Sequence, residues 1–417
     1  MQHTDTLVLG AGHAGLAVSR LLAERGRDHA VLDRGRIGER WLSQRWDSLR
    51  LLTPNWMTRL PGWSYSGDDL DGYMRAAELA GYLGSYAASF RAPVHSGVEV
   101  ESVRAAGDGY SVATSSGTWS AGNVVVATGY CDLPAEPAAL RPLARGIRRV
   151  SAAGYRNPDE LPAGGVLVVG ASASGAQIAD ELARAGRDVV LAVGSHTRMP
   201  RRYRGRDVMF WLDAMGLLDR GAEQVADLES ARREPSLQLV GRPDGRDLDL
   251  ATLQDIGVRL AGRLVGTQAS TVRFAADLGG SVADADARLR RLLARIDRYA
   301  EHSATALPPA EPPRPVPVPA DLTHLDLRAA GITTVVSATG YRREYPWLQV
   351  PVLDQAGEIR QYRGATPAAG LYVVGMRFQT RRNSTFIDGA RHDARLVVDH
   401  LSTHRAAAPA PTLRRAG

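Results

Sequence analysis

The sequence predicts an α/β fold with two Rossmann-like dinucleotide-binding domains, the second inserted in the first. Two glycine-rich turns about 160 residues apart support this prediction: residues 10–15 are Gly-Ala-Gly-His-Ala-Gly, and residues 170–175 are Gly-Ala-Ser-Ala-Ser-Gly. Each turn follows an apolar run typical of a buried parallel strand and precedes a helical pattern. Two dinucleotide sites in one chain indicate electron transfer between nucleotides, so we expect a redox enzyme.

The first turn has the residues that a pyrophosphate site needs. It lies between a predicted strand at residues 6–9 and a predicted helix at residues 16–23. Gly10 permits the tight turn, Gly12 lets the backbone approach the phosphates, and Gly15 lets helix and strand pack closely. The next predicted strand, residues 29–32, is followed by Asp33, whose carboxylate is suitably spaced to accept hydrogen bonds from ribose hydroxyls.

The second turn has the same surroundings but predicts a different nucleotide. Its third position is Ser172, and Ser174 follows before the helix. No acidic residue follows the next strand, residues 188–193. An acidic residue there would repel a 2′-phosphate, so its absence is compatible with NADP. Arg198 and Arg202 lie just beyond and are suited to pair that phosphate, so this site is expected to prefer NADP. The alternative is that these arginines belong to a solvated basic loop.

Two further strand ends, at residues 124–130 and 335–341, both finish in Ala-Thr-Gly-Tyr. In flavoproteins with two nucleotide domains such ends mark places where the chain leaves one domain for the other. With these landmarks the sequence resembles the flavin-containing monooxygenase-like, group B flavoproteins, and within them a bacterial subgroup. Finer matches lie at residues 38–41, 45–50, 155–158 and 381–389, so the resemblance runs through nearly the whole chain.

The resemblance implies that FAD binds in the first domain and is reduced by NADPH. Reduced flavin would then add oxygen to give a C4a-peroxyflavin, which oxygenates a small organic substrate such as an amine, thioether, ketone or aromatic compound. The FAD site is expected to comprise Gly10, Gly12, His13, Ala14, Gly15, Asp33, Arg34, Trp41, Val100, Ala127, Thr128, Gly129, Phe386 and Ile387. The NADP site is expected to comprise Ser172, Ser174, Arg198 and Arg202.

Two side chains are candidates for catalysis. Asp47 is the carboxylate within a tryptophan-rich stretch, residues 41–63, and a buried acid beside a flavin could relay a proton; a structural ion pair with a neighbouring arginine is the alternative. Gln379 could project towards the flavin ring from the segment that crosses beneath it. The helix expected after residues 383–385 would direct its N-terminus, with backbone groups of Phe386 and Ile387, at the ring.

Departures from the family pattern keep other functions open. The family fingerprint Phe-x-Gly-x-x-x-His-x-x-x-Tyr, anchored on Tyr155, meets Arg145, Ile147 and Ser151, and Leu52 stands where the family often has Asn. One alternative is a flavin oxidase or dehydrogenase that its substrate reduces directly, with a vestigial nicotinamide site. The other is a non-catalytic flavoprotein that senses redox state or nucleotide.

Composition limits the kinds of protein, cofactor and partner that the chain is expected to have. The chain has 44% hydrophobic and 23% charged residues, which is ordinary for a globular protein. It has no apolar run of the roughly 20 residues that a membrane span needs, and the first predicted strand leaves no room for a signal peptide. We therefore expect a cytoplasmic enzyme. A single cysteine, Cys131, excludes a dithiol relay within the chain, and no Cys/His spacing indicates a metal. The net charge of +6 comes from scattered arginines without interleaved aromatics, so nucleic acid is not expected as a partner, and the oligomeric state stays open.

These landmarks divide the chain into consecutive parts. Residues 1–155 are expected to form the first part of the FAD domain, residues 156–306 the NADP domain, and residues 320–405 the second part of the FAD domain. Residues 307–319, which are rich in proline, form an extended connector after a long charged helix at residues 283–302. Residues 406–417 are expected to be a disordered tail.

Overall fold

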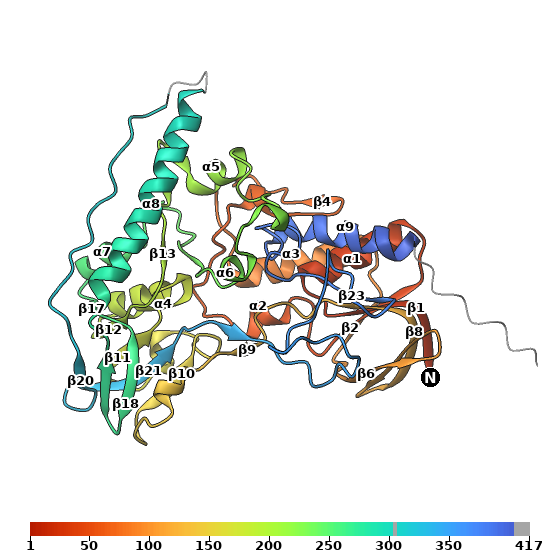
Figure 1. Ribbon diagram of the computed structural model, residues 1–417, viewed down its shortest axis with the longest axis horizontal. Helices are drawn as coiled ribbons and strands as arrows, with labels where there is room; N and C mark the ends of the chain where they lie inside the picture. Colours follow the sequence, from red (N-terminus) through yellow and green to blue (C-terminus); the bar gives the residue numbers. More distant parts are fainter. Residues whose placement is uncertain (303–306, 404–417) are drawn as a thin grey trace, which may run out of the picture.

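The chain folds into two lobes, each built around a mostly parallel β-sheet (Figure 1). The computed structural model describes residues 1–302 and 307–403, so the predicted tail lies outside the described residues. The N-terminus lies in the lobe that also contains the C-terminal helix. The predicted α/β fold with two Rossmann-like domains is confirmed.

The first lobe contains a seven-stranded sheet. Its order is β5-β2-β1-β8-β7-β6, and β23 also pairs with β8. All pairs formed among five of these strands are parallel: β5, β2, β1, β8 and β23. The sheet continues from β8 through β7 to β6 as an antiparallel meander. The bounds are β1 (Gln2–Leu9), β2 (His29–Asp33), β5 (Val94–Ser96), β6 (Val100–Ala106), β7 (Gly109–Thr114), β8 (Gly117–Val126) and β23 (Leu371–Val373).

Alternation along these strands separates two apolar layers. Val8, Val31 and Val125 face α1 (His13–Glu24), α3 (Ala76–Ser89) and α9 (Ile387–Thr403). Their neighbours Leu7, Leu32 and Val124 face a second cluster, which includes residues of the 345–359 segment. Because both faces are covered, the central strands have consecutive apolar residues at 7–9, 30–32 and 124–126, a pattern typical of parallel sheets.

The second lobe contains a five-stranded parallel sheet in the order β10-β21-β11-β12-β17. One face packs against helices and the other against a small antiparallel sheet, β18-β19-β20. The strands are β10 (Arg148–Ser151), β11 (Gly165–Val169), β12 (Val189–Ala192), β17 (Arg259–Ala261), β18 (Leu264–Gln268), β19 (Thr271–Phe274), β20 (His324–Asp326) and β21 (Ile332–Ser337). The helices are α4 (Ala173–Arg184), α7 (Leu250–Asp255) and α8 (Leu278–Glu301).

The domain boundaries differ from those predicted. β10 precedes residue 156 and β21 follows residue 320, yet both strands lie in the second sheet. The second lobe therefore extends from about residue 148 to residue 337, and β21 does not resume the first sheet. The chain crosses between lobes at β9 (Leu133–Pro134) and β22 (Tyr341–Arg342), which pair antiparallel. β9 begins shortly after the first Ala-Thr-Gly-Tyr segment, and β22 begins at the tyrosine of the second.

Shorter elements connect these layers. The short helices are α2 (Glu39–Ser43), α5 (Val208–Ala214) and α6 (Leu228–Arg232), with 3-10 turns η1 (Asn55–Met57), η2 (Ala138–Leu140), η3 (Pro158–Glu160) and η4 (Ala222–Gln224). The short strands are β3 (Arg59–Leu60), β4 (Trp63–Ser64), β13 (Thr197–Arg198), β14 (Arg202–Tyr203), β15 (Arg206–Asp207) and β16 (Leu237–Gln238). Among residues 1–302 and 307–403, no helix is both long and apolar enough to cross a membrane.

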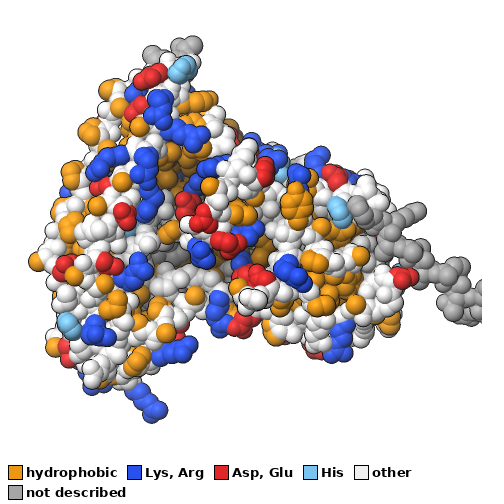
Figure 2. All heavy atoms as spheres, viewed as in Figure 1, with side chains coloured by type: hydrophobic (Ala, Val, Ile, Leu, Met, Phe, Trp, Pro, Cys, Tyr) orange, Lys and Arg blue, Asp and Glu red, His pale blue; other side chains and the backbone are white. Residues whose placement is uncertain are grey.

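The surface mixes charges of both signs. Figure 2 shows acidic side chains lying among the basic ones over the face that it displays. Many basic residues are neutralised in pairs, as with Arg40 and Asp132 at 2.7 Å or Arg204 and Asp297 at 2.6 Å.

Candidate functional site

The first glycine-rich loop has two positions that exclude a side chain and one that opens onto a pocket. Gly10 has φ +114°, and a Cβ there would lie 2.6 Å from the carbonyl oxygen of Ala127. A Cβ on Gly15 would overlap the carbonyl oxygen of Gly10. In contrast, a Cβ on Gly12 would meet no protein atom within 4 Å. The backbone at Gly12 is thus bare towards the pocket, as close approach of a phosphate requires.

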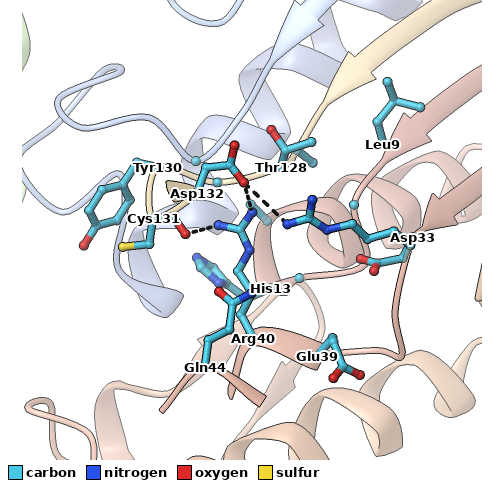
Figure 3. A pocket seen from close by; sticks show the side chains of 18 of the residues that line it. Leu9, His13, Asp33, Glu39, Arg40, Gln44, Thr128, Tyr130, Cys131 and Asp132 are labelled. Atoms are coloured by element: carbon cyan, nitrogen blue, oxygen red, sulfur yellow. Dashed lines mark hydrogen bonds and ion pairs between the residues drawn. The ribbon is translucent and has the colours of Figure 1, made fainter. Parts of the chain in front are cut away.

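The loop forms one wall of a pocket in the first lobe (Figure 3). Most of the residues expected to bind FAD are brought together around it. Those that line it are Gly10, Gly12, His13, Ala14, Asp33, Arg34, Trp41, Val100, Ala127, Thr128 and Gly129. Gly15 lies behind the loop, packed against Gly10.

Asp33 holds the loop in shape from the end of β2. One carboxylate oxygen accepts a hydrogen bond from the backbone N–H of Ala11 at 2.6 Å, and the other accepts one from Gly35 at 2.8 Å. The side chain also lines the pocket. The carboxylate therefore fixes the glycine loop while facing the space where a ribose would lie.

His13 is neutral at physiological pH because of its position in the loop. Burial lowers the pKa of its imidazole to about 4. Its Nε2 atom is buried and has no hydrogen-bond partner within the described part of the chain.

Sequence reasoning assigned no role to Arg40, which closes one side of this pocket. Its guanidinium donates to Asp132 at 2.7 Å and to the carbonyl oxygen of Cys131, and Arg34 approaches the same carboxylate at 3.5 Å (Figure 3). These contacts connect α2 to the chain that leaves β8. The motif Gly-Glu-Arg-Trp at residues 38–41 was the only signal for this arginine.

The structure does not place Asp47 as a buried acid beside either pocket. Its side chain is 51% exposed and accepts hydrogen bonds from Arg156 at 2.9 Å and Asn157 at 2.7 Å. Asp47 lines neither nucleotide pocket. It makes the structural ion pair that was the alternative, with Arg156 in place of a neighbouring arginine.

The structure does not bring the Gln379 side chain into the first pocket either. The residue is 3% exposed, and its amide nitrogen donates to the carbonyl oxygen of Val373 at 3.0 Å. Its amide oxygen accepts from the backbone of Met376 at 3.3 Å. Gln379 therefore shapes the turn that follows β23.

The start of α9 lies near the first pocket. The helix begins at Ile387, and Thr385 lines the pocket two residues before it. Ile387 packs among the helices of the first lobe, whereas the Phe386 side chain packs against a cluster that includes α5 residues. Neither side chain lines the pocket, and contact of their backbone groups with a flavin stays a prediction.

The second glycine-rich loop repeats the geometry of the first. A Cβ on Gly170 would lie 2.5 Å from the carbonyl oxygen of Ala338, and one on Gly175 would overlap the carbonyl oxygen of Gly170. Ser172 and Ser174 line a second pocket at this loop. Each Ala-Thr-Gly-Tyr segment thus provides the alanine carbonyl that packs beneath the first glycine of a loop.

The arginines predicted to bind the 2′-phosphate do not lie at this pocket. Arg198 is 5% exposed, and its guanidinium donates to Asp249 at 2.9 Å and to Asp286 at 2.7 Å. Arg202 is exposed on β14 and donates to the carbonyl oxygen of Gly205 at 3.2 Å. Neither arginine is therefore placed to meet a ligand in this pocket, whose lining includes other arginines, among them Arg232, Arg233 and Arg263.

The two pockets share part of their walls. Trp41, Arg45, Tyr130 and Cys131 line both of them. The Arg45 guanidinium lies 5.3 Å from the centre of the Trp41 ring, a cation–π distance. Leu52 lines the second pocket with Leu49 and Leu51, so the position where the family often has Asn belongs to an apolar wall.

Residues 7–215 match the model of the family described as pyridine nucleotide-disulphide oxidoreductase. The chain belongs to this family. An uncharacterized CzcO-like oxidoreductase of Geobacillus kaustophilus is 31% identical over 409 residues, which are 97% of this chain and 100% of the relative. A probable indole-3-pyruvate monooxygenase of Arabidopsis thaliana is 33% identical over 190 residues, which are 43% of this chain and 44% of the relative.

The fold is shared with solved oxidoreductases. A flavin-containing monooxygenase of Stenotrophomonas maltophilia aligns with a TM-score of 0.67 over 97% of this chain and 99% of its own, at 17% identity. This likeness agrees with the resemblance to group B flavoproteins drawn from the sequence. Within the described ranges, no three His, Cys, Asp or Glu side chains are grouped to hold a metal.

Proposed function

We propose that this oxidoreductase binds FAD and NADPH and uses molecular oxygen to oxygenate a small organic substrate. The observation that carries the proposal is the wall shared by the two pockets, formed by Trp41, Arg45, Tyr130 and Cys131. A ligand on the first glycine loop and a ligand on the second would meet there. Hydride transfer requires such contact between the reacting groups.

The first pocket suits FAD. Gly12 leaves its backbone open to a pyrophosphate, the start of α1 supplies positive potential, and Asp33 faces the position of a ribose. FAD, when bound, supplies two-electron redox chemistry and a centre that reacts with oxygen once reduced. The protein contributes binding, orientation and the aromatic wall at Trp41 and Tyr130.

The second pocket suits NADP. Ser172 and Ser174 face it at the start of α4, where unpaired backbone N–H groups favour a phosphate. Several arginines also line this pocket, including Arg232, Arg233 and Arg263, and they favour an anionic ligand. The strand β12 ends without an acidic residue, as a 2′-phosphate requires.

Oxygenation is favoured by two observations. The plant relative is named as a probable indole-3-pyruvate monooxygenase, and the solved structure is that of a flavin-containing monooxygenase. Near the shared wall, Trp46, Leu49 and Leu52 give the second pocket an apolar side that suits a lipophilic or aromatic substrate.

The test is a rapid-mixing experiment with the purified flavoprotein. NADPH is added without oxygen and the visible flavin absorbance is followed; oxygen is then admitted. We expect fast bleaching, followed by a lasting intermediate with an absorbance distinct from oxidised and reduced flavin. Bleaching with immediate return of the oxidised spectrum would contradict oxygenation and indicate a reductase or oxidase whose electron donor is NADPH itself.

A flavin oxidase or dehydrogenase is the second candidate, because Leu52 offers no hydrogen bond at a position where the family often has Asn. In that case NADPH would leave the flavin oxidised, whereas a substrate added without oxygen would bleach it. If neither NADPH nor any substrate bleached the flavin, a non-catalytic sensing role would be favoured. The same mixing experiment therefore separates the three functions.

A further inference from the structure

The carboxyl ends of β12 and β17 lie side by side at the second pocket. The two strands are parallel neighbours, and Ala192 pairs with Ala261. Residues 194–195 and 263 therefore emerge next to each other, and all three line the pocket. In a Rossmann-like domain this is the edge that receives the adenosine ribose, because it follows the second strand of the nucleotide-binding unit.

Gly194 leaves a space that Arg263 crosses. If Gly194 had a Cβ, that atom would lie 3.9 Å from Nε of Arg263. The side chain of Arg263, which follows β17, thus lies beside Gly194, two residues beyond the end of β12, where the chain has no side chain of its own. Ser195 follows directly and adds a hydroxyl to the same wall.

The Arg263 side chain is available to a ligand. It is 57% exposed, and its nearest carboxylate in the described chain is that of Asp277, at 3.7 Å. This distance is longer than a charge-assisted hydrogen bond, so a phosphate would offer better partners. Arg198, by contrast, is held between two aspartates inside the lobe.

We propose that Arg263, with Ser195, binds the 2′-phosphate of NADP and sets the preference for NADP over NAD. The inference rests on the proposed nicotinamide site. A guanidinium from beyond the neighbouring strand replaces the cation that the end of β12 lacks, and pairs with the phosphate through two N–H groups.

The test measures binding by calorimetry on the FAD-loaded protein. NADP⁺, NAD⁺ and 2′-AMP are titrated into wild type, Arg263→Ala and Arg263→Lys. For Arg263→Ala we expect NADP⁺ and 2′-AMP to bind roughly 10- to 100-fold more weakly, the worth of a charge-assisted hydrogen bond, with NAD⁺ unchanged. Arg263→Lys should recover part of the loss, because the charge stays.

Arg259→Ala is the matched control. Arg259 lies on β17, is 46% exposed and pairs with Asp188 at 3.0 Å, away from the residues that line the pocket. Its replacement removes the same charge and should leave all three affinities unchanged. An equal loss in Arg259→Ala and Arg263→Ala would indicate a general charge effect and overturn the assignment.

Two other results would also contradict the inference. If Arg263→Ala weakened NADP⁺ and NAD⁺ equally, or neither, the 2′-phosphate would lie elsewhere while the nicotinamide site stood. If wild type bound neither nucleotide, the proposed function would fail and the inference with it. Thermal unfolding of each variant checks that the fold is retained.

Discussion

Gly12 and Ser172 stand at the same position in two copies of one loop, yet only the first lacks a side chain. Gly12 has φ −80° and ψ −179°, an extended conformation that any residue can adopt. Nothing in the fold of the described chain therefore demands glycine there. The demand comes from the pocket, where a methyl group would stand in the path of a pyrophosphate.

We therefore expect Gly12→Ala to fold normally and to lose FAD. The measurement is the ratio of flavin to protein absorbance after purification, with the unfolding temperature recorded alongside. Gly81→Ala is the control, since Gly81 lies on α3, is exposed, and a Cβ there would meet no atom within 4 Å in the described chain. A Gly12→Ala protein that stays fully loaded would contradict the first assignment.

Asp393 on α9 is a buried carboxyl group beneath the segment that precedes this helix. It is 0% exposed; Oδ1 accepts a hydrogen bond from the hydroxyl of Thr380, and Oδ2 has no partner in the described chain. Burial raises the pKa of Asp393 to about 6, although the hydrogen bond from Thr380 opposes this shift. The neutral acid is thus favoured in the folded protein below about pH 6, over a wider pH range than in the unfolded chain.

A raised pKa in the folded state makes stability fall as pH rises. The contribution of Asp393 is fully present below its unfolded pKa of roughly 4 and is lost as pH rises through about 6. Relative to wild type, Asp393→Asn should gain up to roughly 3 kcal/mol between pH 4 and pH 7, measured by urea unfolding. Asp399→Asn, at a 53%-exposed site on the same helix, is the control. If the free energies of unfolding of wild type and Asp393→Asn changed in parallel with pH, the raised pKa of Asp393 would be refuted.

Among the connecting elements, β13 shows most clearly what sequence reasoning missed. An arginine just past the end of β12 is typical of a 2′-phosphate site, and the sequence places Arg198 there. Its partners Asp249 and Asp286 follow 51 and 88 residues later, on or beside other helices. Local spacing cannot predict such a pairing, because it depends on how α7 and α8 pack.

Arg198→Ala should therefore destabilise the second lobe without changing nucleotide preference. Removing one partner of a buried ion pair typically costs about 3–5 kcal/mol, since the remaining carboxylates are left unpaired. Urea unfolding measures this loss, and titration with NADP⁺ and NAD⁺ measures the preference. Arg202→Ala, at an exposed arginine on β14, should lose little stability. Selective loss of NADP⁺ binding in folded Arg198→Ala would restore the original assignment.

For the strands too, the sequence predicts features that depend on a short stretch of chain but not the pairing between distant segments. The glycine loops, the first strands and the helix α1 were predictable, because each depends on a short stretch of sequence. The apolar run of β21 was also recognisable, but its sheet was not. Buried parallel strands have similar sequences in either sheet, and only pairing with β10 and β11 places β21 in the second lobe.

In the whole molecule, the proposed function depends on the wall that the two pockets share at the junction of the lobes. The shared wall includes Trp41 and Arg45, which lie on and just after α2 in the first lobe. Arg156, which follows β10 of the second lobe, binds this segment. Its guanidinium donates to the carbonyl oxygens of Leu42 and Arg45 and to the carboxylate of Asp47.

Arg156 is therefore a positioning residue for the junction. Its backbone carbonyl also accepts a hydrogen bond from the N–H of Asp47 at 2.9 Å, so one residue fixes both ends of the 42–47 segment. Arg156→Ala keeps that backbone bond but frees two carbonyl groups. We expect Trp41 and Arg45 to lose their fixed place between the pockets, while both glycine loops stay intact.

The measurable result is a slower reduction of bound flavin by NADPH at unchanged affinity. Misplacement of reacting groups by about 1 Å can cost roughly 100-fold in rate, so we expect a reduction of about 10- to 100-fold in anaerobic rapid mixing. The control is Arg148→Ala on β10, an exposed arginine whose guanidinium donates only to the carbonyl oxygen of Glu160 among the described residues. If NADPH reduced the flavin of Arg156→Ala at the wild-type rate, contact between the lobes through residues 42–47 would not govern hydride transfer. Weaker NADPH binding at an unchanged rate would indicate that Arg156 acts in the second pocket alone.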